Sequence, residues 1–310
     1  MNHLITSSAT ARIELSVSNE LSVSSVAPHV LTVQLLTNEH KLEVLAFLAV
    51  RPVHTVLMTD FISNNGLVSA LNRGSFYACR GERGDLEGVA LIGHMTLFEV
   101  RTEAVLPAFA SVAQNCSAAR LIVGEQDHVE RFWSHYAETG RVPRLVCREL
   151  LLEQRQPPSD QLEAMPGLRP ATSDDLTAVM AVHAEVAFEE SGVDPMKVDP
   201  IGFRLRTARR IEQQRVWVWV ERGRLIFKAD IAASTSRVVY LEGIYVNPED
   251  RGKGYGLHCL AQLSRGLLSR VESVCLLVNI ENQRARNLYQ RIGYKLHSRY
   301  NTVFLQLHSN

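Results

Sequence analysis

The chain has 310 residues, 46% of them hydrophobic, and this length favours about two domains, each able to bury a core. Its 33 basic residues equal its 33 acidic residues, which excludes a strongly charged chain and gives no support to nucleic acid or membrane as a partner. Five cysteines without CxxC spacing are typical of a reducing compartment, no apolar run reaches membrane-spanning length, and no cluster has metal-ligand spacing. We therefore expect a cytoplasmic protein that holds no metal.

Residues 1–29 are expected to form an N-terminal extension, which is rich in Ser, Asn and Thr and lacks the pattern of a secretory signal. Residues 30–153 then alternate between helical and strand patterns, which indicates a first α/β domain. Its expected elements are helices at 43–50 and 55–62, a hairpin at 76–79 and 86–92, a strand at 97–100 that runs into a helix at 103–113, a strand at 121–124, a helix at 128–137 and a strand at 145–152.

A polar segment with a Pro pair, residues 154–167, is expected to be a linker. Residues 168–310 form the second expected domain, and their order of elements partly repeats that of the first. The expected elements are a strand from 168, helices at 176–188 and 200–213, strands at 215–221, 225–232 and 238–246, a helix after the glycines near 254, a strand at 273–278, a helix within 279–294 and a final pair of strands within 294–307.

The most informative segment is the junction at 241–256, where an apolar strand runs into an amphipathic helix. Three glycines in five positions remove side chains from a helix N-terminus, whose unpaired N–H groups and dipole attract anions. A P-loop is excluded because Lys253 is followed by glycine, and a Rossmann fingerprint is disfavoured because Leu257 stands at its third glycine position and too little chain follows. The junction is therefore expected to bind a phosphate or pyrophosphate group.

A third phosphate-binding pattern, Arg/Gln-x-x-Gly-x-Gly/Ala, is met by Arg251, Gly254 and Gly256. Residues 279–294 follow as a second motif, with Asn, three residues to Ala, and then Leu-Tyr and Gly-aromatic pairs, while 168–176 supply an opening strand and a capped helix start. With these three motifs, about 140 C-terminal residues resemble the GCN5-related N-acetyltransferase superfamily. The arrangement is similar to bacterial two-domain members, and it implies an α/β fold of the mixed α+β kind, with a central mixed twisted sheet flanked by helices.

The resemblance implies acetyl-CoA as co-substrate and an N-acetyltransferase, which is an acyltransferase for groups other than aminoacyl groups. Backbone N–H groups of the glycine junction should hold the pyrophosphate, and the preceding strand should pair with the pantetheine arm. The expected cofactor-binding residues are Ile244, Tyr245 and Val246 of the strand, Arg251, Gly252, Lys253, Gly254, Tyr255 and Gly256 of the junction, and Asn282 and Arg286 at the next helix.

Two side chains are candidates for proton transfer. Tyr289 occupies the Leu-Tyr position of the family and is the candidate acid for the departing thiolate, although a tyrosine on this helical face could simply pack. Glu242, on the strand before the junction, is the candidate base, with a salt bridge as the alternative. The resemblance also implies carbonyl polarisation by a backbone N–H at a bulge near 243–245. Leu277 stands where some relatives carry a second acid.

The acceptor is expected to lie beside 188–195, between the first two helices of the second domain. Glu189 and Glu190 there are candidate substrate-binding residues for a cationic amine, unless they are ordinary solvated acids. We expect direct attack by a small-molecule or peptide amine in a ternary complex, in a monomer whose two domains act as a pseudo-dimer or in a homodimer. The alternatives are a non-catalytic acyl-CoA-binding sensor or recruitment module, and a first domain that docks a protein substrate.

The first domain is interpreted as a degenerate copy of the same fold. Its strand-to-helix junction at 100–103 has no glycine and carries Glu103 where a pyrophosphate would lie. We therefore expect this copy not to bind coenzyme A in the usual way, and an unrelated α/β domain is the alternative interpretation.

Overall fold

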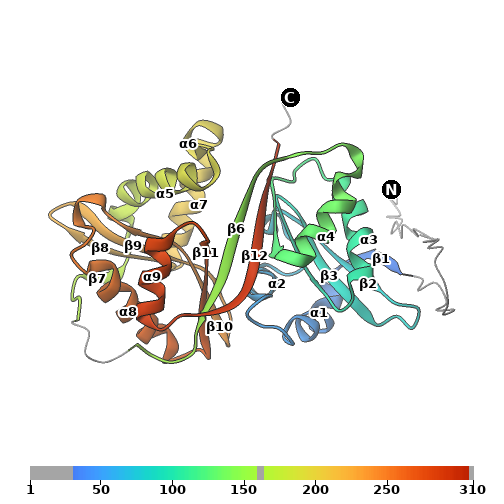
Figure 1. Cartoon of the computed structure of the whole chain (residues 1–310), viewed down its shortest axis with the longest axis horizontal. Helices are drawn as coiled ribbons and strands as arrows, with labels where there is room; N and C mark the ends of the chain where they lie inside the picture. The colour runs from blue at the N-terminus through green and yellow to red at the C-terminus, as the bar shows by residue number, and fades with distance from the viewer. Residues whose placement is uncertain (1–30, 159–163, 307–310) are drawn as a thin grey trace, which may run out of the picture. The chain divides into compact units, whose positions relative to one another are not determined.

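The computed structural model describes residues 31–158 and 164–306, and the chain divides into two compact units (Figure 1). The N-terminal unit consists of Met1–Val146 with Asn301–Asn310, and the C-terminal unit consists of Cys147–Tyr300. Within the described ranges, none of the helices combines the length and apolar character that crossing a bilayer requires.

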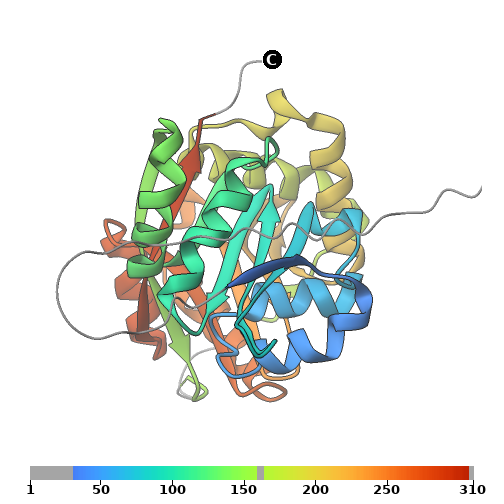
Figure 2. The ribbon, with the colours of Figure 1, turned by 90° about the vertical axis from the view of Figure 1, so that its right-hand side faces the viewer.

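The N-terminal unit is built on strands in the order β1-β2-β3-β4-β5, all antiparallel neighbours except the parallel pair β4 and β5. Its elements are β1 (Thr32–Leu35), α1 (Lys41–Leu48), α2 (Val56–Asn65), β2 (Gly74–Arg80), β3 (Leu86–Gly93), β4 (Met95–Val100), α3 (Leu106–Gln114), β5 (Leu121–Glu125) and α4 (Gln126–Tyr136). Phe109 of α3 and Phe132 of α4 are fully buried in one core with Phe98 of β4. These two helices therefore lie side by side against the sheet (Figure 2).

The C-terminal unit has the strand order β6-β11-β10-β9-β8-β7, in which only β10 and β11 are parallel. Its elements are β6 (Pro143–Gln154), β7 (Leu168–Pro170), α5 (Leu176–Ser191), α6 (Pro195–Val198), α7 (Pro200–Glu212), β8 (Val216–Glu221), β9 (Arg224–Ser234), β10 (Val238–Val246), α8 (Tyr255–Leu268), β11 (Ser273–Asn279), α9 (Gln283–Ile292) and β12 (Lys295–Leu305). The expected hairpin between β8 and β9 is confirmed, because Arg222 and Gly223 have the two positive φ angles, 49° and 75°, of a two-residue turn.

Helices cover both faces of this sheet because its strands alternate between two cores. In β8, Val216 and Val218 pack with α5 and α7, whereas Trp217 and Trp219 pack against the core that holds α8 and α9. The period of two follows from the pleat of a strand. The sheet therefore separates one helical layer, α5 and α7, from another, α8 and α9.

The boundaries between the two compact units do not lie in the expected linker. Residues Glu149–Gln154 of β6 pair one by one with β11, so a strand that was expected to close the first domain belongs to the C-terminal unit. In return, the end of β12 belongs to the N-terminal unit, where the N–H of Leu305 donates to the carbonyl of Arg120 at 2.8 Å. The divisions thus fall inside β6 and β12 rather than at 154–167.

Two other expectations concern the ends of the chain. The expected final pair of strands within 294–307 is wrong, because Lys295–Leu305 is one continuous strand. This stretch contains no Gly or Pro that would favour a tight turn. The expected extension at 1–29 lies outside the described residues.

Candidate active site

The glycine junction forms an open helix N-terminus. Gly252 and Gly254 have φ angles of 85° and 86°, and Gly254 is the N-cap of α8. Residues that have a side chain rarely adopt this backbone conformation, which explains why glycine occupies both positions. A Cβ at Gly256 would lie 3.0 Å from Cγ2 of Val246, so the third glycine lets the helix approach β10 closely. The first N–H groups of α8 have no acceptor within the helix and can bind an anion.

The cationic side chains beside this junction have local partners. Arg251 Nε donates to the carbonyl of Val246 at 3.0 Å, and Lys253 Nζ lies 2.7 Å from Oδ1 of Asp250. Asp250 also pairs with Arg224 at 2.9 Å. The backbone is therefore the part of the junction that is open to an anion, and an incoming pyrophosphate would compete with Asp250 for Lys253.

β10 loses one neighbour just before the junction. Its parallel ladder with β11 ends at the pair Leu241 and Leu276, whereas its ladder with β9 continues to Val246. Strands that part in this way leave backbone N–H and C=O groups of 242–246 open on one edge, where an extended ligand can add as a strand. Tyr245, expected to contact the cofactor, has its side chain buried under α5, so its contact would come from the backbone.

The expected bulge in β10 is confirmed. Glu242 is opposite Asp230, but the next paired residue, Tyr245, is opposite Lys228, so β10 holds one extra residue. Gly243 within it has a φ of 55°, the left-handed conformation that a bulge of this type requires. The bulge therefore lies where β10 has parted from β11.

Tyr289 lies on α9 and is largely buried in the core under α8. Its ring contacts that of Tyr294, with centroids 5.9 Å apart. Burial, together with the negative charge of Glu190, raises the pKa of the Tyr289 phenol above its usual range. The phenol is therefore protonated at neutral pH, as a proton donor must be.

Glu242 and Glu190 differ in what surrounds them. Glu242 forms an ion pair with Arg210 at 2.6 Å, which was the alternative to its role as a base. Glu190, in the last turn of α5, has no ion-pair or hydrogen-bond partner among the described residues. Crowding by surrounding protein, followed by the like charges of Glu242 and Glu149, raises the pKa of Glu190 to about 7. Because Glu190 is also exposed to solvent, it can exchange a proton near neutral pH.

Glu149 is a site residue that sequence reasoning missed. It lies on β6, opposite Asn279 of β11, and its charge contributes to the raised pKa values of Glu190 and Tyr240. Because Glu149 precedes the expected linker, the sequence pattern placed it in the first domain. The only sequence signal is an acid within an apolar strand, and it does not reveal which sheet receives the strand.

The remaining predicted residues have mainly local contacts. Asn282 caps α9, its Oδ1 accepting from the N–H of Ala285 at 3.0 Å. Arg286 Nη1 donates to the carbonyl of Ile280 at 2.9 Å, and Glu189 is exposed near Glu190. Within the described ranges, no group of three or more His, Cys, Asp or Glu side chains could hold a metal ion.

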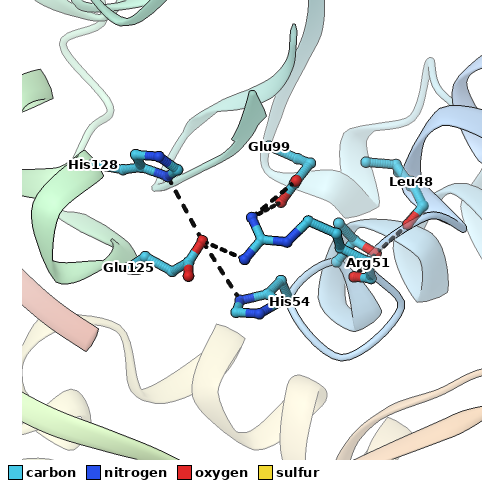
Figure 3. Close-up of polar contacts among 7 residues, drawn as sticks. Leu48, Arg51, His54, Glu99, Glu125 and His128 are labelled. Atoms are coloured by element: carbon cyan, nitrogen blue, oxygen red, sulfur yellow. Dashed lines mark hydrogen bonds and ion pairs between the residues drawn. The ribbon is translucent and has the colours of Figure 1, made fainter. Parts of the chain in front are cut away.

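In the N-terminal unit, ion pairs lie beyond the end of the parallel ladder, at the position where β10 and β11 part in the C-terminal unit. The parallel ladder of β4 and β5 ends at Thr96 with Ile122, and beyond it Arg51 bridges Glu99 and Glu125 at 3.1 and 2.7 Å (Figure 3). The Nδ1 atoms of two histidines, His54 and His128, lie 3.7 Å from the same Glu125 oxygen. Arg51 thus links the ends of β4 and β5 beyond their last paired residues.

The junction after β4 also differs from its counterpart. Glu103 begins a short 3-10 turn before α3 and pairs with Arg131 at 2.9 Å. A carboxylate at this place repels a phosphate, which agrees with the expectation that this copy is degenerate.

Comparisons with known proteins agree with this geometry. Residues 230–304 match the family of FR47-like proteins, whereas no curated protein sequence matches the chain. A tandem GNAT protein from the clavulanic acid biosynthesis pathway has a TM-score of 0.56 at 13% identity, over 90% of this chain and 99% of that one. A GCN5-related N-acetyltransferase from Sphaerobacter thermophilus has a TM-score of 0.56 at 14% identity, over 90% of this chain and 96% of that one.

A Drosophila protein is similar as well, with a TM-score of 0.61 at 14% identity over 89% of this chain and 99% of that one. At these low identities, the structural similarity shows the fold and does not indicate the substrate. The chain therefore has the fold of the GCN5-related N-acetyltransferase superfamily, in its tandem two-domain form.

Proposed function

We propose that this protein transfers an acetyl group from acetyl-CoA to a primary amine, by direct attack in a ternary complex in its C-terminal unit. The observation that carries this proposal is the departure of β10 from β11 immediately before the glycine junction of α8. An edge for an extended amide-containing arm leads there into a cup for a pyrophosphate. Coenzyme A has these two parts in this order.

Each part of the substrate has a matching group. N–H groups at the start of α8 would hold the pyrophosphate, and the 244–246 backbone would pair with the pantetheine arm. A backbone N–H at the bulge beside Gly243 would polarise the thioester carbonyl. One preorganised donor of this kind typically contributes about 3–4 kcal/mol to transition-state stabilisation.

The chemistry then needs one base and one acid. The amine arrives as an ammonium ion, attracted by the carboxylates around Glu190, and Glu190 accepts its proton. The free amine attacks the carbonyl carbon, the C–S bond breaks, and the departing thiolate takes the proton of Tyr289. The proton that the attacking nitrogen loses on becoming an amide returns to the Tyr289 phenolate, which restores the acid for the next cycle. Glu242, held by Arg210, acts by raising the pKa of Glu190 and by attracting the cation.

The acceptor in this proposal is a cationic amine, either a small molecule or a peptide amine. The carboxylates of Glu149, Glu190 and Glu242 lie close enough together for the charges of the other two to raise the pKa of Glu190. Acetyl-CoA is an intracellular metabolite and the cysteines are free thiols, so a cytoplasmic location is part of the proposal.

Binding is tested first, by isothermal calorimetry with acetyl-CoA. Gly254→Glu places a carboxylate in the proposed pyrophosphate cup and should abolish the binding heat. Gly266→Glu is a matched control, because it adds the same side chain to an exposed position of α8 with open space around it. Equal affinity in the wild type and Gly254→Glu, with both folded by circular dichroism, would refute the cofactor assignment.

Turnover is tested second, by release of free thiol from acetyl-CoA in the presence of a panel of amines. The proposal expects steady release with at least one diamine or peptide amine, and mass spectrometry should show the product heavier by one acetyl group. Binding of acetyl-CoA without turnover across the panel would contradict the enzyme and support an acyl-CoA sensor.

A further inference from the structure

A buried ion pair lies directly beneath the bulge of β10. Lys228 is 0% exposed and Asp230 is 2% exposed, and Lys228 Nζ lies 2.5 Å from Oδ2 of Asp230. Both residues belong to β9, where they are the partners of Tyr245 and Glu242, the two residues that flank the extra residue of the bulge. The ion pair therefore spans the two rungs of the ladder between which the bulge is inserted.

Gly243 touches this pair closely. A Cβ at Gly243 would lie 2.8 Å from Oδ2 of Asp230 and 2.9 Å from Nζ of Lys228, both closer than real Cβ atoms approach. The backbone of the bulge thus rests on the two charged groups without an intervening side chain. Any shift of the ion pair must move the bulge or open a gap beneath it.

Side chains of α5 and α7 also interact with the Asp230 carboxylate. Nε2 of His183 on α5 lies 2.8 Å from the same Oδ2 of Asp230. Arg210 of α7 forms an ion pair with Glu242 and also interacts electrostatically with Asp230. The other oxygen, Oδ1, is buried without a partner among the described residues, so the orientation of the carboxylate is set through Oδ2. Contacts from His183 of α5 and from Lys228 of β9 therefore meet at one oxygen atom.

A buried ion pair is a poor source of stability, because the cost of removing both charges from water offsets their attraction. Its charge-assisted hydrogen bonds are short and directional, so it constrains position strongly. We propose that Lys228 and Asp230, held by His183, are positioning residues that fix the β10 bulge and aim its backbone N–H at the reacting carbonyl. The kinetic part of this inference rests on the proposed function, whereas the conformational part does not.

The double variant Lys228→Met/Asp230→Asn removes both charges while it nearly keeps the side-chain volumes. We expect the melting temperature and the acetyl-CoA affinity to stay close to those of the wild type. Amide hydrogen exchange at 242–246 should accelerate at least tenfold, and kcat should fall about 10²-fold with the KM for the amine unchanged, as for a misplaced catalytic group. The matched control is Arg237→Met/Glu272→Gln, which removes the exposed ion pair beside the start of β10 and should change neither quantity.

A second pair of variants covers the case in which the double variant does not fold. His183→Leu removes one hydrogen bond to Asp230 and leaves the ion pair of Asp230 with Lys228 in place, and it should accelerate exchange at the bulge. His183→Gln keeps an N–H donor and should restore slow exchange. Wild-type exchange at 242–246 in both the double variant and His183→Leu would overturn the inference. Absence of wild-type turnover would refute the proposed function instead, and the exchange result would still decide the positioning claim.

Discussion

Replacing Glu190 with Gln should remove activity and at the same time stabilise the protein. The carboxylate is crowded by protein and by the like charges of Glu242 and Glu149, which raise its pKa from 4.5 to about 7. Such a group is costly to ionise in the folded protein. Gln has nearly the same shape and needs no charge, so the variant avoids this cost.

The sign of the pH dependence follows from the direction of the shift. Because the pKa in the fold lies above the unfolded value, stability is fully present below about pH 4.5 and is lost as the pH rises through about 7. One pKa unit corresponds to about 1.4 kcal/mol, but solvent screening reduces this for an exposed group, so we expect a gain of about 1 kcal/mol for the variant at pH 8. The melting temperature should rise by about 2–4 °C at pH 8 and by nothing near pH 4.

The activity of the same variant gives an independent measurement. A general base typically contributes about 10²–10⁴-fold, so kcat at pH 8 should fall by at least about 10²-fold. The acceptor amine titrates equally in both assays, so the ratio of wild-type to variant rates isolates Glu190. This ratio should fall about tenfold between pH 8 and pH 6, as the ionised fraction of a base with this pKa does. Glu189→Gln, at the exposed neighbouring position, is the control.

Two results would refute this reasoning. A Glu190→Gln variant that melts below the wild type at pH 8 would show that the carboxylate stabilises the fold. A ratio of rates that stays constant between pH 6 and pH 8 would show that Glu190 takes no proton in the reaction.

Three further predictions follow from the site. Tyr289→Phe should lower kcat about 10²-fold with unchanged acetyl-CoA affinity, whereas Tyr294→Phe should not, and equal rates for all three proteins would exclude the phenol as the acid. Glu242→Gln removes a like charge and should move the acid limb of the pH–rate profile to lower pH by lowering the pKa of Glu190; a limb that stays in place would contradict this coupling. A fragment of residues 168–310 should fail to fold by circular dichroism, since it lacks the strand that pairs with β11, and a cooperative melt would disprove this.

The sequence was sufficient where structure depends on neighbouring residues. The glycines at 252 and 254 indicated a helix N-terminus without side chains, and the structure gives both a positive φ angle, a property of a single residue, as it does Gly243 in the bulge. The alternation at 215–221 likewise indicated a strand, which the structure confirms as β8. The cap that Asn282 forms on α9 is local in the same way, since capping acts over three residues.

Other features depend on which strands and charges meet in space. Most of β6 belongs to the C-terminal unit and the end of β12 belongs to the N-terminal unit. No local pattern in the sequence specifies which strand becomes the neighbour of another. Glu149 and Glu190 are separated by a linker and two elements in sequence, yet their charges interact. Sequence alone therefore determined the glycine junction and most of the elements, because their causes are local, whereas the bulge was expected from the family resemblance. Only the tertiary structure decided that the charges of Glu149 and Glu242 raise the pKa of Glu190 and that Lys228 and Asp230 lie against Gly243, because electrostatic free energy depends on distance and burial.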